Sequence, residues 1–104
     1  MSLPQFDNEG FLIELNDWNE AVAEQVAVSE SLQLTDVHWQ IIYALRNFYA
    51  RTDLSPAMRP FVKLVKTEVD ASLGTSIVLM QLFGSSPAKT AAKIAGLPKP
   101  TNCI

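Results

Sequence analysis

Residues 35–50, TDVHWQIIYALRNFYA, decide the fold class of this chain. Their apolar side chains recur every three or four positions, which is typical of the core-facing side of an α-helix. Thr35 provides an N-cap, and His38 is expected to pack or cap near the helix start rather than act as a base. The stripe consists of Val37, Ile41, Leu45 and Phe48, widened by Ile42 and Tyr49.

Before this helix, a turn signal and a second amphipathic stretch define the N-terminal third. Apolar residues flank the turn signal at 7–10 in LPQFDNEGFLIEL, and Gly10 can adopt the positive φ of a tight turn, so we expect a small β-hairpin. Next, NDWNEAVAEQVAVSE predicts a helix with Asn16 or Asp17 as its N-cap and Glu20 in its first turn.

Three more helices are predicted after residue 50. Ser55 can cap a segment that begins at Pro56, although Pro60 favours a first turn followed by a helix proper from residue 60. TSIVLMQLF is apolar almost all round and ends at Gly84, which predicts a buried helix. The segment PAKTAAKIA, which follows Ser86, predicts the last helix. The fold class is therefore mainly α, an orthogonal helical bundle with a small hairpin.

Composition limits the function classes. The 104 residues, 48% of them hydrophobic, fit a single domain over 1–104, and no apolar run approaches the length of a membrane span, so we expect a soluble cytoplasmic protein. A lone cysteine and a lone histidine predict no disulfide, no metal and no cofactor. No carboxylate pair, glycine-rich phosphate loop or Ser/His/Asp pattern indicates autonomous hydrolysis or phosphoryl transfer.

Charge is divided along the chain. Residues 1–36 contain eight acidic and no basic residues, whereas residues 37–104 hold all eight basic residues against three acidic ones, a net charge of +5. Such asymmetry can mark a surface for an anionic partner. The candidate contacts with a partner or with tRNA are Arg46, Arg59, Lys63 and Lys66.

The final segment, KIAGLPKPTNCI, places the only cysteine next to the last residue. Pro98 and Pro100 exclude a helix and favour an extended arm over residues 96–104, with Gly96 as its hinge. From Gly96 such an arm reaches about 20 Å, which suits a thiol presented to other proteins. Lys99 is the one basic residue in the tail beyond the hinge and can oppose the terminal carboxylate near Cys103.

This tail resembles the C-terminal signature of the TusE/DsrC/DsvC family of sulfur-carrier proteins. Supporting matches are spread over most of the chain. They are Asp7 to Leu12 with Trp18, His38-Trp39, Phe48-Tyr49, Ser55 to Arg59, Leu82-Phe83 and Pro87 to Lys89. The resemblance implies the same helical bundle and assigns the role of persulfide carrier to Cys103.

Two departures from the family pattern refine this implication. DsrC proper has a second cysteine where this chain has Ala92, so Cys103 cannot form an internal disulfide or trisulfide, which favours the TusE branch. That branch implies sulfurtransfer from a TusBCD-like donor complex to an MnmA-like thiouridylase that makes 2-thiouridine in tRNA. Asn102 stands where DsrC proteins commonly have glycine, and this difference has little influence on the assignment.

Three alternatives stay open from the sequence. The chain could serve another dissimilatory or oxidative sulfur pathway as a DsrC-like partner. It could also be a helix-turn-helix-like nucleic-acid regulator, although Pro56, Pro60 and a net charge of -3 argue against stable independent DNA binding. Finally, it could be an adaptor in which the thiol has no role.

Overall fold

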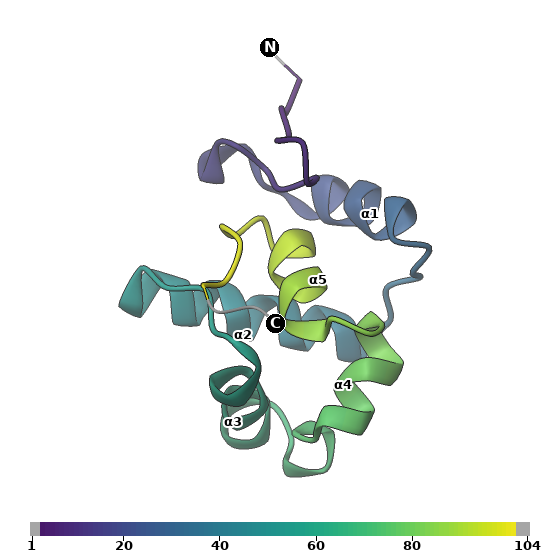
Figure 1. The fold of residues 1–104 in the computed structure, drawn as a ribbon, viewed down its shortest axis with the longest axis vertical. Helices are drawn as coiled ribbons and strands as arrows, with labels where there is room; N and C mark the ends of the chain where they lie inside the picture. The colour runs from purple at the N-terminus through teal and green to yellow at the C-terminus, as the bar shows by residue number, and fades with distance from the viewer. Residues whose placement is uncertain (1–2, 102–104) are drawn as a thin grey trace.

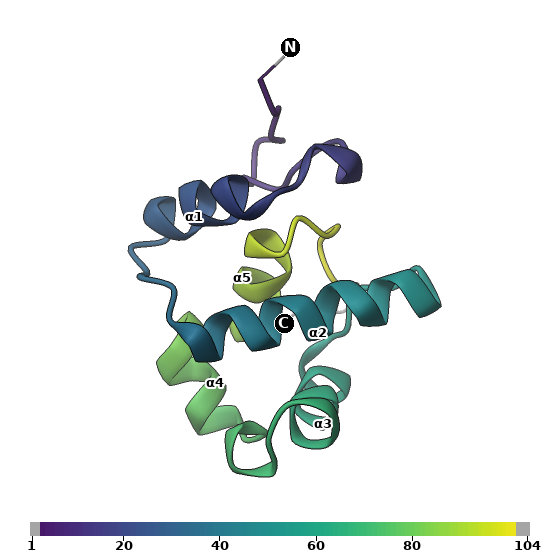
Figure 2. The same ribbon diagram turned by 180° about the vertical axis from the view of Figure 1, so that it is seen from behind.

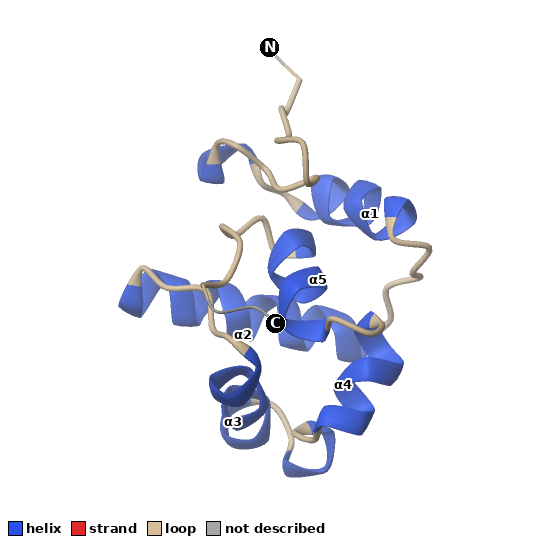
Figure 3. Cartoon of the chain, viewed as in Figure 1, coloured by secondary structure: helices blue, strands red, loops and turns tan. Residues whose placement is uncertain are grey.

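Five α-helices carry the fold in the computed structural model, which describes residues 3–101 (Figures 1 and 3). They are α1 (Glu20–Ser29), α2 (Asp36–Thr52), α3 (Met58–Glu68), α4 (Ser76–Phe83) and α5 (Pro87–Ile94). Two short 3-10 turns, Leu15–Asp17 and Ala71–Leu73, precede α1 and α4. The mainly helical prediction is confirmed.

α5, one of the two shortest helices, lies at the centre of the bundle. α5 contacts each of the other four helices, and Figures 1 and 2 show it between α1 on one side and α2 on the other. Seven of its eight residues are buried, and only Lys89 is half-exposed. Alanines at 88, 91 and 92 let the surrounding helices approach closely, so α5 acts as the core element of the bundle.

The helix predicted from residues 35–50 is confirmed as α2, with Thr35 as N-cap. His38 completes a capping box, because its Nδ1 accepts from the Thr35 backbone N–H at 3.1 Å. Its Nε2 lies 2.7 Å from the Leu82 carbonyl oxygen at the end of α4, and its ring meets Phe83 edge-on. The expected packing and capping role is confirmed, and the same side chain joins α2 to α4.

The predicted β-hairpin is not found. In residues 3–101 the only β-type pairing is one isolated antiparallel bridge between Phe6 and Leu12. The chain does reverse direction there, because Gly10 has a φ of +90° and its N–H donates to the Asp7 carbonyl. The Asp7 carboxylate also accepts from the Glu9 and Phe11 amides, so side-chain bonds reinforce a backbone pairing that is too short to form strands.

Two predicted helix starts are wrong by a few residues. α1 begins at Glu20 behind Asn19, whose side chain accepts from the Val22 amide, while the earlier candidates Asn16 and Asp17 lie in the 3-10 turn. α3 begins at Met58, between the two predicted starts. Pro60 is its third residue, where the missing N–H has no intrahelical partner to lose.

α4 has the predicted bounds but not the predicted burial. Thr75 caps it and Gly84 ends it. Only Leu79 and Phe83 are buried, while Ile77 is 70% exposed, because α4 packs on α3 and α5 from one side. Across residues 3–101, no helix is both long and apolar enough to cross a membrane.

Candidate functional site

The predicted sulfur carrier, Cys103, lies outside the described residues. The structure does describe the segment that leads to it, from the end of α5 to Thr101. This segment, the tail (residues 95–101), folds back over the domain toward α2 (Figure 1). Its contacts define the candidate site.

Two long side chains hold the last carbonyls of α5. The Trp18 indole Nε1–H donates to the Ile94 carbonyl at 3.0 Å, and an Arg46 guanidinium N–H donates to the Ala95 carbonyl at 2.7 Å. A helix end leaves such carbonyls without intrahelical partners, so these bonds cap α5 from outside. The Arg46 guanidinium also lies 3.9 Å from the Trp18 ring centroid, which makes the two side chains one clamp, here called the Trp18–Arg46 clamp.

Arg46 therefore does not act as the free anion contact that was expected. Burial lowers the pKa of its guanidinium, which stays charged at neutral pH because the ordinary value is so high. The charge is used inside the domain, on the Ala95 carbonyl and the Trp18 ring. The sequence grouped Arg46 with the surface cations because a local pattern cannot reveal partners that are remote in the chain. One of these partners, Ala95, lies 49 residues away.

Gly96 is a packed joint rather than an open hinge. Its φ is +74°, and the amides of Gly96 and Leu97 donate to the carbonyls of Lys93 and Ala92, which is the Schellman arrangement. Leu97 is only 2% exposed, so it belongs to the core. Trp18 covers the glycine so closely that a Cβ there would stand 2.8 Å from its Cγ.

Beyond Leu97 the tail stays in contact with the domain. The Ser55 hydroxyl donates to the Pro98 carbonyl at 2.6 Å, Lys99 Nζ donates to the Glu9 carboxylate at 2.9 Å, and Pro100 is buried. The expected reach of about 20 Å from Gly96 is thus wrong, because the chain is held as far as Pro100 and only three residues, at most about 10 Å, separate it from Cys103.

Sequence reasoning missed three of the residues that hold the tail. Trp18 was named only as a match to the family pattern, Ser55 as a helix cap, and Glu9 as part of a turn signal. Ser55 makes no helix cap, since Ala57 takes the N-cap position of α3, and its hydroxyl is used on the tail instead. No local pattern could reveal these roles, because the partners lie 43 to 90 residues away along the chain.

The remaining predicted cations share one face of α3. Arg59, Lys63 and Lys66 fall four and three residues apart, so their side chains project from the same side of the helix. All three are exposed, and none makes an ion pair or hydrogen bond within residues 3–101. We call this surface the α3 basic stripe.

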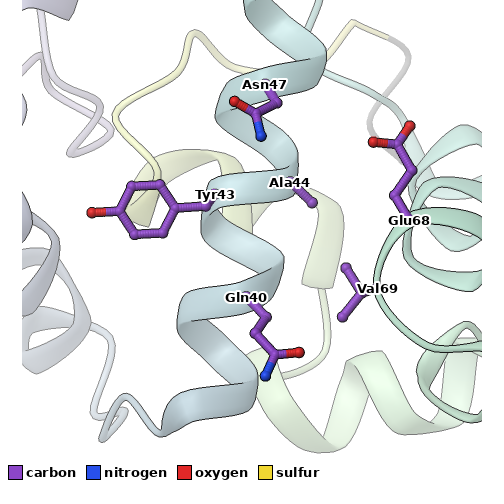
Figure 4. Close-up of a pocket in the computed structure, with 6 residues that line it drawn as sticks. All are labelled: Gln40, Tyr43, Ala44, Asn47, Glu68 and Val69. Atoms are coloured by element: carbon purple, nitrogen blue, oxygen red, sulfur yellow. The ribbon is translucent and has the colours of Figure 1, made fainter.

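A shallow groove also lies between α2 and the end of α3 (Figure 4). Its volume is about 260 Å³, and it is lined by Gln40, Tyr43, Ala44, Asn47, Glu68 and Val69. Tyr43 points away from the groove in Figure 4, and its hydroxyl donates to Glu20 at 2.5 Å, which raises the pKa of the phenol. The groove contains none of the predicted site residues, so it contributes no reactive group.

Glu9 provides an acid-sensitive tie on the tail. The hydrogen bond and charge of Lys99, helped by Lys89 at 3.5 Å, lower the pKa of Glu9 below its ordinary value of 4.5. A lowered carboxyl pKa means that the tie is intact above pH 4.5 and is lost as the pH falls through the lowered value. The pair is exposed, so its effect on global stability is small.

We therefore expect Glu9→Gln to loosen the tail at neutral pH without lowering the thermal midpoint appreciably. Backbone ¹⁵N order parameters of Lys99 and Thr101 should fall in this variant, and the wild type should show the same fall only in acid. Glu68→Gln is the matched control, because it breaks the exposed Arg51–Glu68 pair elsewhere on the surface. Unchanged order parameters in Glu9→Gln would contradict the tie.

The chain is similar to known proteins along nearly its whole length. Residues 3–104 match the family described as DsrC like protein. The Haemophilus influenzae protein named "Sulfurtransferase TusE homolog" is 45% identical over 98 residues, which cover 94% of this chain and 90% of that protein. "Sulfurtransferase TusE" of Buchnera aphidicola is 42% identical over 94% of this chain and 86% of its own length.

Solved structures share the fold. The NMR structure of Allochromatium vinosum DsrC superposes with a TM-score of 0.88 at 42% identity, covering 97% of this chain and 90% of that one. The crystal structure of the oxidized gamma-subunit of dissimilatory sulfite reductase (DsrC) from Archaeoglobus fulgidus gives a TM-score of 0.83 at 38% identity, over 97% and 92% of the two chains.

Proposed function

Because this chain belongs to the DsrC-like protein family, we propose that it is a sulfurtransferase of the TusE type, which relays sulfur as a persulfide on Cys103. Its curated relatives carry that name, and they align with it over 94% of this chain. The structural observation that supports the proposal is the anchored tail. The Trp18–Arg46 clamp, Ser55 and Glu9 hold the residues that lead directly to the only thiol.

The relay needs only thiol exchange. The Cys103 thiolate attacks the outer sulfur of a donor persulfide, a new sulfur–sulfur bond forms on Cys103, and the donor cysteine leaves as a thiolate. In the second step an acceptor thiolate attacks the outer sulfur on Cys103 and regenerates the Cys103 thiolate. Each step exchanges one thiolate for another, so no external oxidant or reductant is required.

A short, stiff attachment favours delivery into a partner's active site. Pro98 and Pro100 restrict the tail, and its anchors fix where it leaves the domain, so less conformational entropy is lost on docking than with a long flexible arm. Ala92 is fully buried and brings no second thiol, so both steps are intermolecular. The partners we propose are a TusBCD-like donor complex and an MnmA-like thiouridylase bound to tRNA.

The α3 basic stripe is the surface that we assign to the anionic side of this assembly. Arg59, Lys63 and Lys66 place three positive charges, without ion-pair partners among residues 3–101, on one exposed helix face, which suits phosphates of tRNA or acidic side chains of a partner. Three cations can contact only a few phosphates. We therefore favour contact with tRNA inside a complex over independent binding to DNA.

Sulfur loading tests the proposal directly. The purified chain is incubated with a cysteine desulfurase and L-cysteine, and its intact mass is measured without reductant. We expect a gain of one sulfur atom, reversed by dithiothreitol. The same chain alkylated beforehand should gain nothing, since Cys103 is the only cysteine in the sequence. Failure to gain sulfur from any persulfide donor would contradict carriage.

The alternative role, as a DsrC-like partner in another sulfur pathway, differs in the acceptor rather than in the thiol. The similarity of this fold to solved DsrC structures supports this alternative. Sulfur loading with no effect on 2-thiouridine in cells would favour it over tRNA thiolation.

A further inference from the structure

A hollow lies where α4 ends and α5 begins, and it extends along α5. Its volume is about 360 Å³. Its polar groups come from two parts of the chain, since Glu30 follows α1 and the others lie just before α5 or along it (Figure 1). Its polar lining consists of Glu30, Ser85, Ser86, Lys89, Thr90 and Lys93.

The start of α5 offers hydrogen-bond donors that the chain does not use. No side chain caps this helix, because the Ser86 hydroxyl makes no capping bond. Pro87 has no N–H, and the amides of Ala88 and Lys89 have no acceptor within residues 3–101. Two free amides at a helix N-terminus, with the positive end of the helix dipole, attract an anion.

Thr90 gives an independent sign of a ligand. The residue is only 8% exposed and lines the hollow, yet its hydroxyl makes no hydrogen bond with any described residue. In the same part of the chain no side-chain nitrogen or oxygen is both sealed from solvent and unpaired. The Thr90 hydroxyl therefore opens into the hollow, where it lacks a partner that a buried polar group ordinarily has.

Two lysines bring positive charge to the hollow, and each of them also contacts a carboxylate. Lys93 is 9% exposed and lies 3.1 Å from the Glu30 carboxylate, which balances its charge, and its ammonium lies 5.3 Å from the centroid of the Phe11 ring. Lys89 shares Glu9 with Lys99, at the longer distance of 3.5 Å. The lining thus has two ammonium groups against one carboxylate, with further N–H donors on each lysine.

We propose that this hollow binds a single tetrahedral oxyanion, a phosphate group being the chemical type that fits. The amide of Lys89 and the hydroxyls of Ser86 and Thr90 supply donors at the hollow, and Lys89 supplies charge. Phosphate accepts several short hydrogen bonds at once, as this set of donors requires.

The test is a titration of the full chain with inorganic phosphate at neutral pH, at constant ionic strength set by chloride. ¹H–¹⁵N spectra should show saturable shifts at the Ala88, Lys89 and Thr90 amides. Thr90→Val keeps the side-chain shape and touches no ion pair, and it should weaken phosphate binding several-fold. Lys89→Gln should weaken it about tenfold, as loss of a charged hydrogen bond predicts. Arg51→Gln removes an exposed positive charge on α2 and should leave the affinity unchanged.

A second arm distinguishes the source of the phosphate. If a short RNA shifts the same amides and inorganic phosphate displaces it, the ligand is a backbone phosphate of RNA; if only phosphate shifts them, it is a small free anion. Either result supports the oxyanion site. Shifts that never saturate with either probe, or equal affinity in wild type, Thr90→Val and Lys89→Gln, would overturn it. Sulfur loading of Cys103 is measured separately, so the two proposals can fail independently.

Discussion

Serine in place of Cys103 is expected to remove 2-thiouridine from tRNA in cells that rely on this chain for sulfur relay. A hydroxyl cannot hold a sulfane sulfur, so every transfer through this position stops, whereas most surface substitutions change activity only in part. The measurement is the 2-thiouridine content of total tRNA by mass spectrometry, in a bacterial strain that lacks its own TusE and expresses either form. The variant should match the strain without any relay protein.

Two controls make this result specific to the thiol. The thermal midpoint of purified Cys103→Ser should equal that of the wild type, because the described core ends before residue 103. Lys99→Gln alters the same tail while keeping the thiol, and it should retain most of the modification. A normal 2-thiouridine level in Cys103→Ser would exclude the relay and return the chain to the adaptor class.

Gly96→Ala is expected to destabilise the whole domain, by about 3 kcal/mol in the free energy of unfolding. Two destabilising effects add at this residue. Its φ of +74° disfavours any side chain, and the new Cβ would overlap the Trp18 ring. Urea denaturation should show a lower midpoint with an unchanged m-value, since the native core is the same and only its stability falls. A loss of this size is a large part of the stability of a small domain.

A double-mutant cycle separates the two costs. Trp18→Ala removes the ring that the new methyl group meets, although its own Cβ still lies 3.0 Å from the added atom. The loss in the double variant should therefore be smaller than the sum of the two single losses, and the difference measures the steric part. Strict additivity would mean that only the backbone strain at Gly96 matters.

The parts of the fold that the sequence predicts are those with local causes. Thr35, the apolar stripe from Val37 to Phe48, and Gly84 each act on neighbours within one or two turns, and α2 and the end of α4 are where they were expected. The start of α1 was missed because Asn16, Asp17 and Asn19 can all cap a helix. Only packing decides among them.

The candidate site was predictable in its chemistry but not in its geometry. Cys103 stays a prediction from its chemistry and its place in the family tail, and Pro98 and Pro100 account for the absence of helix in the tail up to residue 101. That Leu97 and Pro100 would be buried could not be predicted, because their burial depends on Trp18 and Ser55, which are remote in sequence. The partners of Arg46 inside the domain were missed for the same reason, since the sequence pattern of a helical arginine is the same whether its guanidinium meets solvent or a tryptophan ring.

The central position of α5 also has a consequence for biosynthesis. A ribosome makes the residues of α1 to α4 before those of α5, the element that the other four helices surround. The nascent chain therefore cannot complete this core until α5 has left the ribosome. A product that terminates before residue 87 lacks the central helix and the thiol together, so it leaves no well-folded but inert competitor for the same partners.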